Sequence, residues 1–249
     1  MWGLNSLANL DENKLKIARV GGIRAIVRVM RLFEQDREIQ LEGTEALLNL
    51  SQLEGSDAIH DRIISCGSVV AVVRAMQVHK RNADLQLNAC WVLGNLASHD
   101  DFPTAGDNNA IACIVEAMRT HGDHLVSREA CEALAHLAVS SPINADRVID
   151  AGGVATLAVA LLRHPLDDQV QLHACQALLD LCDHDLSCLA LLIEAGGIDA
   201  IASTYVRFAE PVSGGRKTGG NYDSAIEHAA GALGKKQDKT RGGSRVGLA

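Results

Sequence analysis

The chain has 249 residues, of which 47% are hydrophobic and 22% are charged, and its formal net charge is −8 at pH 7. This length and apolar content are enough for a sizeable folded core and exclude an intrinsically disordered chain. Only 3% of the residues are aromatic, and the Ala, Leu, Val and Ile that remain as core formers favour closely packed helices over a sandwich of sheets.

Targeting and membrane signals are missing from the sequence. The N-terminal stretch lacks the basic, apolar and small-residue order of a signal peptide, and the longest nearly uncharged apolar tract, around residues 151–162, is far shorter than the ~20 residues that span a bilayer. Seven cysteines without paired C-x-x-C spacing fit a reduced compartment better than a disulfide framework. We therefore expect a cytoplasmic or nuclear protein without a membrane partner.

The sequence pattern of one helix recurs along the chain. Its first copy, "WGLNSLANL" (residues 2–10), begins inside the helix, and four fuller copies follow: "QLEGTEALLNLS" (40–51), "QLNACWVLGNLA" (86–97), "SREACEALAHLA" (127–138) and "QLHACQALLDLC" (171–182). The spacings between the fuller copies are 46, 41 and 44 residues. Such a period predicts an array of repeats, and it implies that the chain starts in the middle of one.

A second recurring segment lies between these helices. It combines a turn, in most copies with Gly at the end of the preceding helix, and an apolar helix: residues 19–30, 65–76, 106–118, 150–162 and 194–206. A shorter apolar run precedes most of these turns: residues 12–20, 58–65, 144–150 and 188–194. The sequence therefore predicts three helices in each unit.

Three helices, a glycine turn and this period resemble the armadillo repeat family. The resemblance is carried by "NLA" or "NLS" at the end of the third helix and by "AGGI" or "AGGV" at the start of the second, and it covers residues 1–208. It implies an all-α, right-handed superhelical solenoid with a concave groove lined by the third helices, and a role in binding proteins. Residues 98–110 contain Pro103 and few apolar residues, so the first helix of that unit is expected to be short or absent.

The repeat pattern loosens after residue 208. We expect a Gly-rich insertion at 209–223, the last helix of a terminal unit at 224–234, and a basic flexible tail at 235–249. The tail carries Lys235, Lys236, Lys239 and Arg241, so it is one candidate occupant of the groove and could contact nucleic acid weakly. Nucleic acid is otherwise not an expected partner.

The third helices place polar side chains at three offsets that should face the groove. The candidate binding residues are Asn9, Glu42, Glu45, Asn49, Asn88, Trp91, Asn95, Glu129, Glu132, His136, His173, Gln176 and Asp180. An asparagine offers both a donor and an acceptor to the backbone of an extended peptide, and Trp91, one turn from Asn95, offers a face to a Lys or Arg side chain. Glutamates on both sides of the Trp91 row should give the groove a negative potential, which favours a basic partner segment.

Other interpretations of the same residues stay open. The importin-α branch of the armadillo family uses Trp and Asn at this spacing to hold nuclear localisation peptides, but here the pair occurs in full only once. The asparagines could instead tie neighbouring repeats together while Trp91 packs on its neighbours. The array could also be the regulatory or docking region of a larger multidomain enzyme, or an architectural array that binds through its convex side. Its uncapped first repeat could also lead the protein to self-associate.

Metal binding and catalysis are not expected, and no cofactor is predicted. His79, His121 and His164 recur at the end of the second helix, where a partial positive charge suits the helix dipole and the free carbonyls, and they lie a repeat apart. Cys90, Cys131 and Cys175 recur as small residues for close helix packing, and the histidines and cysteines of 173–188 lack a ligand spacing. "GGRKTGG" (214–220) lacks the glycine of a phosphate loop, and "GGSRVG" (242–247) does not fit a nucleophile elbow.

Overall fold

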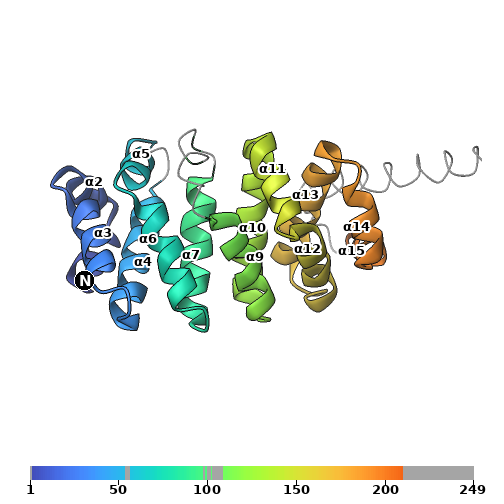
Figure 1. The fold of residues 1–249 in the computed structure, drawn as a ribbon, viewed down its shortest axis with the longest axis horizontal. Coiled ribbons are helices and arrows are strands. Elements are labelled where there is room, and N and C mark those ends of the chain that lie inside the picture. The colour runs from blue at the N-terminus through green and yellow to red at the C-terminus, as the bar shows by residue number, and fades with distance from the viewer. Residues whose placement is uncertain (1, 54–56, 98, 100–101, 103–108, 210–249) are drawn as a thin grey trace, which may run out of the picture.

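Helices stack side by side into an elongated array in the computed structural model, which describes residues 2–53, 57–97, 99, 102 and 109–209. Every regular element in these ranges is an α-helix, so the predicted all-α solenoid is confirmed. The array advances from the N-terminal helices at one end to α14 and α15 at the other (Figure 1).

The predicted three-helix unit recurs along the chain. The third helices are α1 (Trp2–Ala8), α4 (Arg37–Ser51), α7 (Ala83–Leu96), α10 (His124–Ser140) and α13 (Asp168–His184). The second helices are α3 (Gly22–Leu32), α6 (Ser68–Val78), α9 (Ala110–Thr120), α12 (Gly153–Arg163) and α15 (Gly197–Ala209). The shorter first helices are α2 (Asp11–Arg19), α5 (Asp57–Ser65), α11 (Pro142–Asp150) and α14 (Cys188–Glu194).

Each third helix packs mainly against the third helices before and after it, so these helices form one continuous layer. The core of the described array is one cluster of buried side chains from all three helices of the units, mostly Ala, Leu, Val and Ile with some Met and Cys. Cys90, Cys131 and Cys175 are buried in it as predicted. Burial raises the pKa of the Cys90 and Cys131 thiols, and it raises the pKa of Cys175 to about 12, so these thiols are neutral packing groups.

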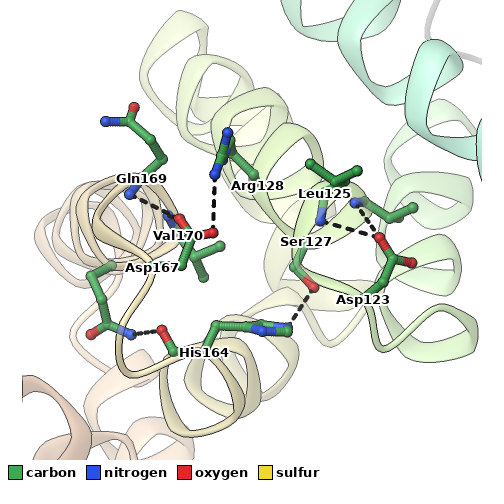
Figure 2. A network of polar contacts seen from close by, with 10 residues as sticks. Asp123, Leu125, Ser127, Arg128, His164, Asp167, Gln169 and Val170 are labelled. Atoms are coloured by element: carbon green, nitrogen blue, oxygen red, sulfur yellow. Dashed lines mark hydrogen bonds and ion pairs between the residues drawn. The ribbon is translucent and has the colours of Figure 1, made fainter.

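An Asp or Asn begins each full third helix. The Asp36, Asp123 and Asp167 side chains each accept two backbone N–H groups of the first turn, and Asn82 accepts one. Figure 2 shows the two caps nearest the C-terminal end, where the Arg128 side chain also donates to Asp167 at 3.1 Å. Partial burial acts to raise the pKa of Asp167, but the Val170 backbone N–H and Arg128 outweigh it and hold that pKa below its usual value.

The predicted left-handed turns precede the second helices. Gly21, Gly67, Gly152 and Gly196 have φ between 70° and 84°, a region that costs other residues energy because of their Cβ. In the atypical unit Asn109 takes this position with φ 62°, which is consistent with the tolerance of asparagine for this conformation.

A buried glutamine joins the second and third helices of three units. Gln40, Gln86 and Gln171 each donate Nε2 hydrogen bonds to two carbonyls at the end of the preceding second helix; the acceptors are Met30 and Phe33, Met76 and His79, and Leu161 and His164. We call this arrangement the glutamine clamp. Ser127 stands at the equivalent position in the fourth copy, and its hydroxyl lies 3.1 Å from Nε2 of His164 instead.

Several predicted segments lie wholly or partly outside the described residues. They are the insertion at 209–223, the last helix at 224–234, the tail at 235–249 and most of the stretch from 98 to 110. Within that stretch Phe102 is 1% exposed and belongs to the hydrophobic core. Among the helices that are described, none has the length and apolar character needed to cross a bilayer.

Candidate functional site

Most of the predicted binding residues lie on the stacked third helices, on a surface we call the third-helix face. Asn49 on α4 donates to the side-chain oxygen of Asn5 on α1 at 2.8 Å, and Asn5 donates to the Glu42 carboxylate at 3.2 Å. Asn9 lies one residue beyond α1, exposed in the turn that leads to α2. The first two rows therefore form an inter-helix hydrogen-bond network, with Glu45 half-exposed on the same helix as Glu42.

The Trp91 row lies on α7, at the middle of the face. Trp91 is 36% exposed, with Asn88 half-buried one turn before it and Asn95 one turn after it. The Asn95 amide donates to Oγ of Ser51, the last residue of α4, at 2.9 Å. The amide donors of Asn49 and Asn95 thus connect neighbouring repeats, as the alternative interpretation proposes, while the indole ring keeps part of its surface open to solvent.

Two glutamates on α10 follow the Trp91 row. Glu129 and Glu132 are both half-exposed and one turn apart. Burial, followed by the charge of Glu132, raises the pKa of Glu129 to about 7, although Arg128 acts in the opposite direction. This carboxylate is therefore only partly ionised at neutral pH, and a cation placed beside it would promote its ionisation.

The last rows pair polar groups within the protein. Nδ1 of His136 lies 3.3 Å from the Gly94 carbonyl on α7, and Gln176 donates to the Asp180 carboxylate at 3.2 Å. His173 lies 3.9 Å from Glu132. Burial lowers the pKa of His173, and His136 and Arg128 add to this against the opposing charge of Glu132, so the His173 ring is neutral at pH 7. Burial, followed by Asp183, has the opposite effect on Asp180 and raises its pKa despite the Gln176 hydrogen bond.

Two hollows in the described surface involve the end of the second helix α6. One of about 550 Å³ is lined by Arg37, Gln77, Val78, His79, Lys80, Arg81 and Asn82, and another of about 300 Å³ lies between α6 and α9. These two hollows therefore do not include the predicted binding residues of the third-helix face.

The recurring histidines occupy the ends of the second helices, as the sequence predicts, but their hydrogen-bond partners differ from the expected ones. The His79 and His121 side chains lie 2.8 and 2.7 Å from backbone carbonyls of the preceding unit, those of Glu34 and Lys80. These imidazoles therefore join units, rather than serving the carbonyls of their own helix. The expected positive charge is wrong for His164, since burial and the neighbouring Arg163 lower its pKa.

Two features of the fold were missed by the sequence-based reasoning. The glutamine clamp could have been found, because "QL" opens three of the four fuller copies of the third-helix motif. A second feature, a close pair of histidines at positions 60 and 99, leaves no signal in the repeat alignment because His99 lies in the atypical stretch. In the described residues, one group of three potential metal ligands occurs, Asp57, His60 and His99, and it contains none of the histidines or cysteines considered from the sequence.

Comparison with known proteins agrees with this architecture. Residues 61–98 match the Armadillo/beta-catenin-like repeat family; they contain most of α5, all of α6 and α7, and the Trp91 row. No curated protein matches the sequence significantly.

Solved structures resemble the whole described array. An engineered protein has 24% identity, with 94% of this chain and 88% of that chain covered and a TM-score of 0.73. A designed armadillo repeat protein has 17% identity, coverage of 93% and 91%, and a TM-score of 0.74. Another designed armadillo repeat protein, in complex with the peptide (KR)4, has 18% identity, coverage of 93% and 90%, and a TM-score of 0.71. The described chain therefore has the fold of an armadillo-repeat solenoid, and residues 61–98 match the armadillo repeat in sequence.

Proposed function

We propose that the protein is a non-catalytic scaffold that holds an extended, basic segment of a partner protein along the third-helix face. The observation that carries this proposal is the partly exposed Trp91 on α7, placed between half-exposed glutamates of the neighbouring helices α4 and α10. A designed armadillo repeat protein of the same fold holds the basic peptide (KR)4, which supports the class of ligand.

The chemistry of the face suits lysine and arginine side chains. The indole of Trp91 offers an electron-rich surface on which a cationic head group and its aliphatic stem can lie. Glu129 and Glu132 offer negative charge beside it, and a cation would promote ionisation of Glu129, whose pKa is about 7. Since the Asn95 amide already bonds Ser51, its side-chain oxygen is the group that would accept a peptide N–H.

Peptide titrations followed by Trp91 fluorescence test the proposal. In a Trp2→Phe background Trp91 is the remaining tryptophan, and its emission is measured with (KR)4, an acidic peptide and a neutral peptide. We expect saturable binding of (KR)4 alone, weakened by salt because exposed charges are screened. Glu132→Gln should weaken it, whereas the matched change Glu194→Gln, an exposed glutamate on α14, should leave it unchanged.

The contrary outcomes are equally definite. A flat titration with all three peptides would remove the third-helix face as a peptide site and direct the search to the convex side. Binding that Glu132→Gln and Glu194→Gln weaken equally would mean attraction to the net negative charge rather than to this face.

Nuclear-import-type recognition is a narrower form of the same proposal. It rests on Trp91 and Asn95 lying one turn apart on α7. It predicts that a single lysine in the peptide dominates affinity, since the pair occurs once in the repeats, and substitution of the peptide one residue at a time would show this. A cytoplasmic or nuclear location remains a prediction, to be checked by imaging the tagged protein.

A further inference from the structure

Two histidines from different units meet beside the third-helix layer. His60 lies on α5, and His99 follows the end of α7. Nδ1 of His60 is 2.6 Å from Nε2 of His99, and the rings are arranged edge to face with their centres 4.5 Å apart. Asp57 precedes His60 by one helical turn, and one potential ligand atom from each of the three side chains lies within 4.8 Å of the others.

The groups on the outer sides of the two rings orient them. Nε2 of His60 lies 2.7 Å from the Ser51 carbonyl, and because a carbonyl only accepts, this nitrogen must carry the hydrogen. Nδ1 of His99 lies 3.6 Å from the Asp61 carboxylate, which favours a hydrogen on that nitrogen too. Neutral rings oriented in this way direct their lone pairs toward each other, so the space between them is suited to a cation.

We propose that Asp57, His60 and His99 form a binding site for a divalent transition metal ion of the Zn²⁺ class. Two imidazole nitrogens and a carboxylate oxygen are a ligand set that suits zinc, cobalt and nickel better than calcium or magnesium, and water would complete a four-coordinate site. Zinc–nitrogen bonds of about 2.0–2.1 Å in tetrahedral geometry separate two nitrogens by roughly 3.3 Å. The rings would therefore move apart by less than 1 Å from the separation seen here.

The outer partners match those that support metal-bound histidines. A backbone carbonyl on one ligating histidine and a carboxylate on the other fix the ring orientation and increase the basicity of the ligating nitrogen. Here Ser51 and Asp61 hold these places. The same arrangement does not recur at His79 or His121, where each ring faces a single backbone carbonyl.

A metal in this site would connect three parts of the array. Asp57 and His60 belong to α5, His99 follows α7, and the carbonyl that holds His60 belongs to Ser51 at the end of α4. Oγ of Ser51 also accepts the Asn95 amide. The ion would therefore stabilise the joint between two units next to the Trp91 row, and its binding does not depend on the proposed peptide function.

Cobalt and zinc titrations of the full chain, stripped of metal with a chelator, test this site. We expect one Co²⁺ per chain, with the visible absorption of a four-coordinate ion, and its displacement by Zn²⁺. Asp57→Asn, His60→Gln and His99→Gln should each weaken binding by more than about 100-fold, and Asp61→Asn by about tenfold, as losses of a ligand and of an outer partner respectively. His121→Gln, which removes a histidine bonded to a lone carbonyl, should bind Co²⁺ like the unchanged protein.

The Asp57→Asn variant separates ligation from packing, because it leaves the histidine pair intact. Its metal-free melting temperature should fall only by the small effect of losing one negative charge in the first turn of α5, while its Co²⁺ affinity falls by more than about 100-fold. Absence of saturable Co²⁺ or Zn²⁺ binding by the unchanged protein would overturn the proposal and would mean that a hydrogen, rather than a metal ion, lies between the two rings. Binding that survives Asp57→Asn and His99→Gln would place the ion elsewhere and overturn it equally.

Discussion

The half-buried Glu129 makes a sharp prediction about stability and pH. Replacing it with glutamine keeps the shape of the side chain and its contacts on α10 but removes the charge. The folded state raises the pKa of this carboxyl from 4.5 to about 7, mainly through burial and then through Glu132. Folding therefore disfavours the ionised form, and Glu129→Gln should stabilise the protein wherever Glu129 is ionised in both states.

The magnitude follows from the pKa of Glu129. At about 1.36 kcal/mol for each pKa unit, the shift corresponds at face value to roughly 3 kcal/mol. Because the side chain is half-exposed and screened by solvent, we expect about 1 kcal/mol in practice. The folded chain binds more protons than the unfolded chain between pH 4.5 and about 7, so stability falls with rising pH across this window.

Urea denaturation at pH 4, 6 and 8 measures this difference in the free energy of unfolding. Glu129→Gln should match the unchanged protein at pH 4, exceed it slightly at pH 6 and exceed it by about 1 kcal/mol at pH 8. Glu116→Gln, an exposed glutamate on α9, is the matched control and should show no such trend. A gap that is constant with pH, or one that reverses at pH 8, would refute the assignment of Glu129 as a buried, disfavoured charge.

Three further predictions concern the fold. Gln86→Ala breaks the clamp on the Met76 and His79 carbonyls and should lower the free energy of unfolding in urea by roughly 2–4 kcal/mol. The exposed control Gln52→Ala should lower it by less than about 0.5 kcal/mol. Equal losses in the two variants would show that the clamp does not contribute to stability. In Gly153→Ala the added Cβ would lie 2.5 Å from Cγ1 and 2.8 Å from the backbone oxygen of Val148. Thermal denaturation should therefore show a loss of stability of about 1–3 kcal/mol. Gly3→Ala, where the space around the added Cβ is open, should change the stability little. Cys131 is fully buried and has a raised pKa, so it should react with a maleimide only after unfolding. The half-exposed Cys66 should react in the folded state. Similar reaction rates of the two thiols in the folded protein would contradict the burial of Cys131.

The sequence predicts the architecture well because the repeat supplies several observations of the same helix. Each copy places apolar residues on the same face, and Gly or Asn marks the same left-handed turn, so the three-helix unit can be recognised without coordinates. The burial of Phe102 could not be predicted in this way, since the stretch around it has no counterpart in the other copies.

The binding face is only partly predictable for a physical reason. Alignment shows which residues share a column, but not whether a polar group is directed at solvent or at the next repeat. The sequence and the structure both place Asn95 and Trp91 one turn apart, yet only the structure shows that the Asn95 amide already bonds Ser51. The pairing of His60 with His99 depends on the path of the chain after α7, which repeat periodicity does not encode.

The substitution of Ser127 for the clamping glutamine has a consequence for the mechanics of the rod. The glutamines at 40, 86 and 171 hold the last turns of α3, α6 and α12, but Ser127 bonds His164 instead of reaching back to α9. Amide protons in the last turn of α9 should therefore exchange with solvent faster than their counterparts in those three helices. Since each unit of a repeat array contacts only its neighbours, bending would concentrate at this joint between α9 and α10.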